Sequence, residues 1–216
     1  MPIRAVLLDF GGVFTASPFQ VFTRAAAELD ATPERVLGLV FGPYDRDTDH
    51  PWHRLERGEL PLAEARDAII ELARADGLTL DPLKILVGTL AGGGVREPVV
   101  GLTRRLRAAG VRTALVTNNA REFGAGWRSM LPLDELFDAV IDSSAVGVRK
   151  PNPAIFELAL HAVGGVAPQQ AVFLDDFTGH VEAARRLGLH ALLVEDDPSA
   201  ALAELERLAL RDEERP

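Results

Sequence analysis

Five short apolar runs, each followed at once by polar residues, constrain the fold of this chain more than any other feature. The runs are continuous rather than alternating, a pattern typical of parallel strands that are buried on both faces. Helix-like stretches separate the later runs, so we expect a doubly wound, mostly parallel α/β sheet with helices on both faces. The five runs are residues 5–8, 113–116, 139–141, 171–174 and 191–194.

A long segment after the first run breaks this alternation, because residues 16–95 contain no comparable strand-like run. Apolar residues recur there at helical spacing, and turn signals divide the segment into short helices. The glycines at 92–94 indicate a hinge back to the main domain. We therefore predict an α/β core formed by residues 1–15 and 96–216, with residues 16–95 inserted as a helical cap domain. The helices expected in the insertion are residues 19–29, 33–40, 61–75 and 81–90.

The charge and residue content exclude several classes of protein. The 216 residues include 32 acidic and 23 basic side chains, which gives a formal net charge of −9 and argues against nucleic acid as a partner. No apolar run approaches the roughly 18 residues of a membrane helix, and no signal peptide is recognisable before Asp9, so we expect a cytoplasmic protein without a membrane partner. The chain has no cysteine, which excludes a thiol nucleophile and a cysteine-based metal site. The oligomeric state stays open, and a homodimer is one of the states that the sequence allows.

The polar residues that follow the strand-like runs are the candidates for a site. Asp9 ends the first run, Thr117 and Asn118 end the second, and Asp175 and Asp176 end the fourth. Ligands of open α/β sheets bind beyond the carboxyl ends of the strands, where the strand order reverses. If the strand order is 3-2-1-4-5 with right-handed crossovers, the first, second and fourth strands lie side by side. These residues would then converge.

The convergence of these residue types indicates phosphoryl transfer. Two carboxylates such as Asp9 and Asp176 repel each other unless a cation lies between them, and hard carboxylate oxygens suit Mg²⁺. The hydroxyl of Thr117 and the amide of Asn118 can hydrogen-bond phosphoryl oxygens, and Lys150 after the third run can supply a positive charge. A carboxylate can also attack phosphorus and form an aspartyl-phosphate intermediate.

The residues around these positions resemble the four motifs of the haloacid-dehalogenase-like (HAD) hydrolase superfamily. Within it, the chain is similar to the proteins that resemble the N-terminal phosphatase domain of soluble epoxide hydrolase. That closer similarity rests on Arg57-Gly58-Glu59, Val146-Gly147 and Val181-Glu182-Ala183-Ala184-Arg185. The four motifs are Leu7-Leu8-Asp9-Phe10-Gly11-Gly12-Val13, Leu115-Val116-Thr117-Asn118, Arg149-Lys150-Pro151-Asn152-Pro153 and Phe173-Leu174-Asp175-Asp176.

The resemblance implies a Mg²⁺-dependent phosphatase that acts on a small phosphorylated metabolite, with Asp9 as the nucleophile. It also implies that the helical insertion closes over the site and selects the substrate. The implied Mg²⁺ ligands are Asp9, the backbone carbonyl of Gly11, Asp176 and, either directly or by holding another ligand, Asp175. The implied catalytic and substrate-binding residues besides Asp9 are Thr117, Asn118 and Lys150.

Two positions depart from the pattern of the family. Many of its phosphatases carry a second aspartate, two residues after the nucleophile, which protonates the leaving group. This chain has Gly11 there, and general acid catalysis typically contributes about 10²–10⁴-fold. The other departure is His180, where close relatives often have asparagine. It could contact waters of the metal site, contact the cap, or only begin a helix.

Some polar clusters favour a structural interpretation. Asp142, Ser143 and Ser144 are more typical of a loop than of a substrate contact. A second cluster has the composition of a metal site but no standard ligand spacing, so we expect a solvated loop, with a substrate contact by Trp52 or His53 left open. Its members are Asp45, Asp47, Asp49, His50, Trp52 and His53.

Two alternatives to the phosphatase remain. A 2-haloacid dehalogenase would use the same Asp9 on carbon and need no metal, but the acid pair Asp175-Asp176 argues against it. A non-catalytic regulatory or binding protein on the same fold is kept open by Gly11, because a fold does not guarantee chemistry.

Overall fold

A five-stranded parallel sheet forms the centre of the computed structural model, of which we describe residues 1–90 and 94–210, with only the backbone of residues 20 and 87–90. The hinge expected at residues 92–94 lies outside this description except for Gly94. Neighbouring strands pair in parallel in the order β3-β2-β1-β4-β5, so the expected topology is confirmed. The strands are β1 (Ala5–Leu8), β2 (Arg112–Thr117), β3 (Ala139–Asp142), β4 (Ala171–Asp175) and β5 (His190–Leu193).

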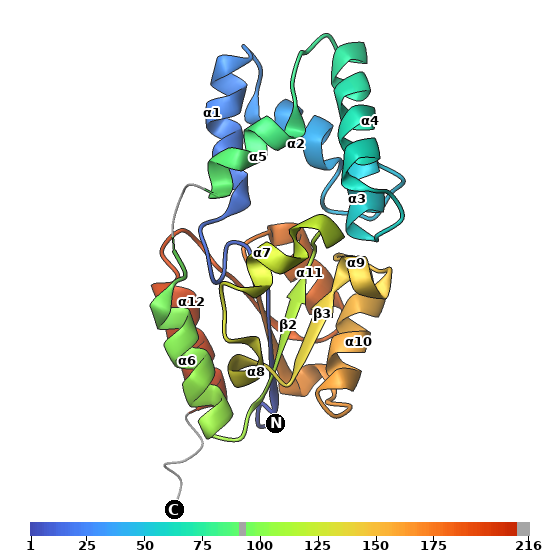
Figure 1. The fold of residues 1–216 in the computed structure, drawn as a ribbon. Coiled ribbons are helices and arrows are strands. Elements are labelled where there is room, and N and C mark those ends of the chain that lie inside the picture. The colour runs from blue at the N-terminus through green and yellow to red at the C-terminus, as the bar shows by residue number, and fades with distance from the viewer. Residues whose placement is uncertain (91–93, 211–216) are drawn as a thin grey trace, which may run out of the picture.

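Helices cover both faces of the sheet (Figure 1). One face packs on α6 (Glu97–Ala108) and α12 (Ser199–Ala209), and the other packs on α10 (Pro153–Ala162) and α11 (Thr178–Arg186). Successive strand residues point to opposite faces, which is why the apolar runs are continuous. Three short helices lie in the loops of the sheet: α7 (Gly124–Arg128), α8 (Leu133–Leu136) and α9 (Ser143–Val146).

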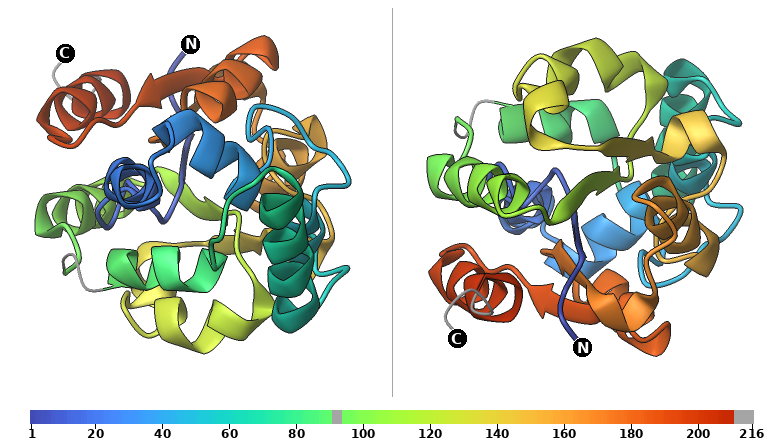
Figure 2. Two further views of the ribbon diagram at one scale, coloured as in Figure 1. Left: turned by 90° about the horizontal axis from the view of Figure 1, so that it is seen from above. Right: turned by 90° about the horizontal axis from the view of Figure 1, so that it is seen from below.

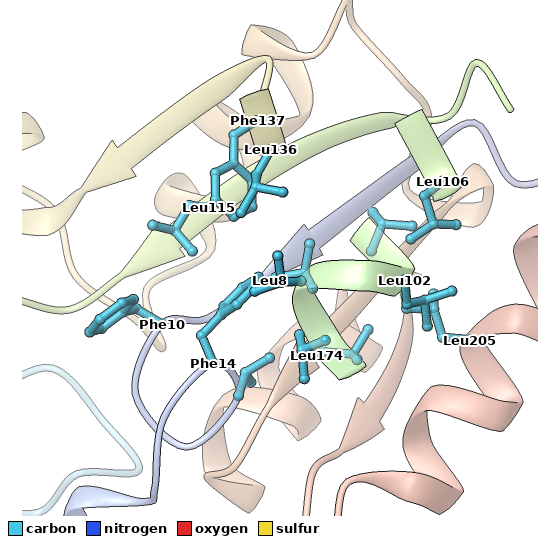
Figure 3. Close-up of a cluster of buried hydrophobic side chains, with 14 of the residues drawn as sticks. Leu8, Phe10, Phe14, Leu102, Leu106, Leu115, Leu136, Phe137, Leu174 and Leu205 are labelled. Atoms are coloured by element: carbon cyan, nitrogen blue, oxygen red, sulfur yellow. The ribbon is translucent and has the colours of Figure 1, made fainter. Parts of the chain in front are cut away.

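The alternation along β1 shows how the two cores form. Leu8 belongs to the cluster under α6 and α12, where it lies opposite Leu115 of β2 and Leu174 of β4 (Figure 3). Leu7 belongs instead to the cluster under α10 and α11, together with Phe173. All five side chains are fully buried. The two cores therefore fix the register of β1 and, with it, the point where Asp9 leaves the sheet.

The segment between β1 and α6 folds as helices that lie beyond the carboxyl ends of the strands (Figures 1 and 2). We call residues 18–90 the helical segment. It packs around a separate hydrophobic cluster, to which Ala120 of the loop after β2 also belongs. After a 3₁₀ turn at Pro18–Gln20, its helices are α1 (Val21–Glu28), α2 (Pro33–Phe41), α3 (Pro51–Glu56), α4 (Leu62–Ala75) and α5 (Pro82–Leu90).

Local sequence explains where these helices begin. Thr32 caps α2 by accepting a hydrogen bond from the backbone of Arg35, and Pro33 occupies the first helical position. His50 caps α3 in the same way through Trp52 N. The expectation of a solvated loop over residues 45–53 is wrong for the last part of that range, because Trp52 and His53 belong to α3 and are 7% and 0% exposed. Among the described residues, no helix is both long and apolar enough to cross a membrane.

Candidate active site

Three carboxylates meet at the carboxyl edge of the sheet. Asp9 follows β1, Asp175 ends β4, and Asp176 comes next, and each offers an oxygen that lies within 4.8 Å of the others. Their convergence results from the pairing of β1 with β4, since the Asp9 amide donates to the carbonyl of Leu174 at 2.9 Å. The predicted meeting of Asp9 with the acid pair is therefore present in the structure.

Lys150 supplies the positive charge at this cluster. Its ammonium lies 2.8 Å from Oδ2 of Asp9 and 2.7 Å from Oδ2 of Asp175, and its side chain is fully buried. Burial alone would lower the pKa of Lys150, but the attraction of Asp175 and Asp9 raises it above its ordinary value. The lysine is thus a permanent cation between two acids.

The side chain of Asn118 fixes the backbone of this lysine. Its Oδ1 accepts from Lys150 N at 2.8 Å, and its Nδ2 donates to Lys150 O at 3.0 Å. The structure therefore brings Asn118 into the site, with its amide group bonded to the peptide of Lys150. This two-point contact holds the lysine on the loop after β3.

Asp175 is the acid whose charge is best compensated. Its carboxylate accepts from Phe177 N at 2.8 Å and contacts Nδ1 of His180 at 3.1 Å, in addition to Lys150. Burial opposes ionisation, but Lys150 and His180 outweigh it and hold the pKa of Asp175 well below its usual range. Asp175 is therefore ionised across the neutral pH range, and its carboxylate oxygens already bond Lys150, Phe177 N and His180.

Asp176 is the acid whose charge is least compensated. Burial, followed by repulsion from Asp175, raises the pKa of Asp176 to about 7, and its buried Oδ2 has no hydrogen-bond partner. Burial also raises the pKa of Asp9, against the pull of Lys150 and with the repulsion of both other acids. One lysine does not balance three carboxylates, so the donor set and the unpartnered Oδ2 fit a hard divalent cation.

Glycine at position 12 makes this arrangement sterically feasible. Gly12 has a φ of +73°, and a Cβ there would lie 2.0 Å from the carboxyl carbon of Asp176. Gly11 is less crowded, because a Cβ would only reach ordinary contact with Pro18 at 3.5 Å. The turn after β1 therefore lets Asp176 approach the backbone directly, which only glycine permits.

Other candidates from the sequence occupy more peripheral or structural positions. Thr117 is buried at the end of β2, the neighbour of β1, and its hydroxyl makes one long contact of 3.4 Å with Asn118 O. Asp142 caps α9 by accepting from the backbone and hydroxyl of Ser144 at 3.1 and 2.8 Å. The structural interpretation of residues 142–144 agrees with this geometry.

His180 lies where the sheet meets the helical segment. Besides contacting Asp175, its ring lies 5.1 Å from the ring of Tyr44 and 5.0 Å from that of Phe177, between centroids. Burial is the main cause of the lowered pKa of His180, and its Nε2 is buried without a partner. Of the three roles left open by the sequence, contact with the helical segment is present.

A buried polar network that was not predicted from the sequence joins the helical segment to the loop before Lys150. Glu56 of α3 accepts from Tyr44 Oη and Trp52 Nε1, both at 2.9 Å, and from Arg149 Nε at 2.6 Å. Arg149 precedes Lys150 and its guanidinium lies 4.8 Å from the centre of the Tyr44 ring. The only sequence signal for this network is that Arg149 directly precedes Lys150. Tyr44 and Glu56 lie more than 90 residues away from Arg149 in sequence, so no local pattern links them to it.

A doubly wound parallel sheet that carries a lysine-paired aspartate and two further acids at its switch point defines a class of hydrolases built on carboxylate chemistry. A family model described as haloacid dehalogenase-like hydrolase matches residues 3–188. The chain belongs to this family and is a hydrolase.

Curated relatives include phosphatases and parts of longer proteins. A phosphatase of Mycobacterium tuberculosis is 35% identical over 90% of this chain and 88% of its own length. Acyl-CoA dehydrogenase family member 10 of Mus musculus is 33% identical over 95% of this chain, and bifunctional epoxide hydrolase 2 of Rattus norvegicus is 28% identical over 96%. The chain spans only 19% and 39% of the lengths of these last two relatives.

Solved structures share the fold at low identity. An L-2-haloacid dehalogenase superposes with a TM-score of 0.67 at 20% identity, over 95% of this chain and all of that one. A HAD family enzyme of Bacteroides thetaiotaomicron, crystallised with magnesium and inorganic phosphate, gives 0.59 at 19% identity over 90% and 96% of the two chains. These likenesses support the fold of the chain.

Proposed function

We propose that this hydrolase is a Mg²⁺-dependent phosphatase of small phosphomonoesters and works through an aspartyl-phosphate on Asp9. The observation that carries the proposal is the carboxylate of Asp9, ion-paired with Lys150 and flanked by the poorly compensated Asp176. The phosphatase among the relatives and the magnesium in a neighbour of the same fold support it.

The residues proposed to hold Mg²⁺ are Asp9, Asp176 and the backbone carbonyl of Gly11. Asp175 is already bonded to Lys150, Phe177 N and His180, so we assign it to holding these groups in place. A bound Mg²⁺ supplies charge stabilisation to a phosphoryl group and offsets the repulsion among the acids. A bound Mg²⁺ would also give the buried Oδ2 of Asp176 the partner that it lacks.

The covalent step is assigned to Asp9. One of its oxygens attacks phosphorus, the new O–P bond replaces the bond to the leaving alcohol, and the electron pair of that broken bond stays on the alcohol oxygen. Oδ1 is held by Phe10 N at 2.7 Å and Oδ2 by Lys150 at 2.8 Å, so the carboxylate is oriented before substrate arrives. Water then cleaves the aspartyl-phosphate at phosphorus and releases inorganic phosphate.

The other residues position and stabilise the transferring group. Lys150 can reach a phosphoryl oxygen while it still touches Asp175, which keeps a positive charge at the reacting centre. Thr117 is assigned to phosphoryl binding through its hydroxyl, and Asn118 to the same site through its hold on Lys150. We propose that residues 16–95 act as the cap, which excludes water from the site.

The test is a panel of phosphomonoesters assayed with Mg²⁺, with EDTA, and after Mg²⁺ is restored. We expect phosphate release that EDTA abolishes and Mg²⁺ recovers. Halide release from 2-haloacids that EDTA does not affect would instead support a dehalogenase. Binding of Mg²⁺ without turnover of any ester would support a non-catalytic protein.

A further inference from the structure

Arg149 is a buried cation that the proposed mechanism does not use. Its side chain is fully buried, Nε donates to Glu56 at 2.6 Å, and Nη1 donates to the carbonyl of Arg46 at 3.3 Å. Its Nη2 has no partner. A buried donor left unpaired is destabilising, so an unpaired guanidinium nitrogen needs a physical cause.

The position of Arg149 relates this nitrogen to the site. The next residue, Lys150, reaches Asp9 with its ammonium, and the guanidinium of Arg149 lies against the ring of Tyr44. That ring also lies 5.1 Å from the ring of His180, between centroids. Arg149 thus lies between the loop that carries Lys150 and the helical segment, in a layer on the side of the sheet where a leaving group attached to a phosphoryl group on Asp9 would extend (Figure 1).

A second unpaired atom lies in the same layer. Nε2 of His180 is buried and without a partner, and Arg149 is close enough to contribute to the lowered pKa of that histidine. Nδ1 of His180 faces Asp175 and carries the proton of a neutral ring, so Nε2 is an acceptor while Nη2 of Arg149 is a donor. A hydroxyl can accept from a donor such as Nη2 and can donate to an acceptor such as Nε2, so a substrate with several hydroxyls can supply a partner to each atom.

The charges around Arg149 favour an uncharged ligand group. Glu56 lies 2.6 Å from Nε, and a carboxylate oxygen of Asp47 lies 3.7 Å from Nη1. The single positive charge of Arg149 is therefore already met by two acids of the helical segment. A substrate carboxylate would add a third anion beside them and beside the anionic phosphoryl group, which is unfavourable in a buried layer.

We propose that Nη2 of Arg149 binds a hydroxyl oxygen of the leaving group, so that the substrate is the phosphate ester of a polyhydroxylated alcohol. This inference rests on the proposed phosphatase function and adds the class of its substrate. Arg149 is then a residue that sets specificity: it selects a hydroxylated ester over the matching ester without hydroxyls. Sites that hydrogen-bond a substrate hydroxyl reject the analogue that lacks it, because the buried donor is then left unpaired.

The experiment compares glycerol 1-phosphate with propyl phosphate, which have the same carbon chain. We expect kcat/KM to favour glycerol 1-phosphate by about tenfold or more in the wild type. In Arg149→Met the ratio falls to about one. The control Arg57→Met removes an arginine of the helical segment, which bonds Asp47 and Glu59, and is expected to keep the wild-type ratio.

A variant that separates binding from folding accompanies this comparison. Arg149→Met leaves Glu56 without its ion-pair partner, so the double variant Arg149→Met/Glu56→Gln is measured as well, and thermal unfolding identifies the folded proteins. The same ratio of about one in the folded double variant supports the proposal. A wild-type ratio near one, or a ratio unchanged in both variants, overturns it.

Binding measurements keep this inference distinct from the proposed function. Calorimetric titration of Asp9→Asn with the two esters, in Mg²⁺, is expected to show tighter binding of glycerol 1-phosphate. If both esters release phosphate at the same rate, the proposed hydroxyl site is wrong and the phosphatase function stands. If glycerol 1-phosphate binds more tightly but no ester releases phosphate, the phosphatase function is wrong and the hydroxyl site stands. Tighter binding of 3-phosphoglycerate than of glycerol 1-phosphate overturns the assignment of an uncharged group.

Discussion

Asp9, Asp175 and Asp176 share one edge of the sheet, but their charges are held in different ways. Lys150 and His180 keep Asp175 ionised, whereas burial raises the pKa of Asp9 and of Asp176. A carboxyl group with a pKa of about 7 is half protonated at neutral pH, so it responds to both protons and cations. In the proposed site, Asp176 is therefore the residue expected to couple metal binding to pH.

We predict that the affinity for Mg²⁺ rises with pH up to about pH 7 and then levels off. The metal binds the ionised form of Asp176, and below a pKa of about 7 a proton competes for the same carboxylate. The apparent dissociation constant should therefore fall by about fivefold from pH 6 to pH 7 and change little from pH 8 to pH 9. Calorimetric titration at these four pH values measures it, and a flat profile would contradict the raised pKa.

Restoring an acid at position 11 is predicted to increase activity on alkyl phosphates. Gly11 leaves the leaving alcohol without the usual proton donor, and a Cβ there meets only ordinary contact with Pro18. General acid catalysis is worth about 10²–10⁴-fold, so even a poorly placed carboxyl in Gly11→Asp should raise kcat for propyl phosphate by about tenfold or more. Aryl phosphates, whose leaving groups need no proton, should change little. Equal gains on both classes would contradict this account.

The turn between β1 and the helical segment is the element on which the metal site depends. Gly12 adopts a positive φ and lies against the carboxylate of Asp176, so a methyl group at this position must displace that side chain. The same turn sets the exit of the chain from β1 after Asp9. This short turn therefore determines the distance between Asp9, which follows β1, and Asp176, which follows β4.

Gly12→Ala is predicted to weaken Mg²⁺ binding by tenfold or more, because the new Cβ would lie 2.0 Å from the Asp176 carboxyl carbon. Gly77→Ala is the matched control, since Gly77 has a similar φ of +84° but nothing within 4 Å of an added Cβ. The control should lose about 1 kcal/mol of stability from backbone strain and keep its affinity. Equal losses of affinity in the two variants would show that strain, not the clash, is responsible.

The elements differ in how well the sequence predicts them. The strands are predictable because burial on both faces leaves a continuous apolar run, as in Ala5–Leu8. The helix α3 is not, because its six residues include Trp52, His53 and Glu56, which are buried against partners from outside the helix: Phe41, Tyr44 and Arg149 respectively. The meeting of Asp9 with Asp176 follows from strand order, whereas the contact of Glu56 with Arg149 follows from how distant elements pack.

At the scale of the molecule, Glu56 joins the helical segment to the sheet. It is 2% exposed and receives hydrogen bonds from Tyr44, Trp52 and Arg149, of which only the last belongs to the sheet's own loops. Close approach of the two parts also depends on Gly58, where a Cβ would lie 2.5 Å from the carbonyl oxygen of Ser144. The position of the helical segment above the site is thus fixed by a few buried polar contacts.

We predict that Glu56→Ala destabilises the protein by about 3–5 kcal/mol, because it leaves Arg149 buried without its counter-ion. Glu59→Ala removes a more exposed acid of the same segment, paired with Arg57, and should cost no more than about 1 kcal/mol. Denaturant unfolding of the two variants beside the wild type measures the difference. Similar losses in both would mean that the buried ion pair does not hold the helical segment in place.

Mass spectrometry shows whether Asp9 carries the phosphoryl group during turnover, as we propose. The wild-type protein is quenched with acid while it hydrolyses an ester in Mg²⁺, and the peptide that contains Asp9 is weighed. We predict that this peptide gains one phosphoryl group, and that Asp9→Asn shows neither the modification nor phosphate release. Full turnover by Asp9→Asn, with an unmodified peptide in the wild type, would contradict the account.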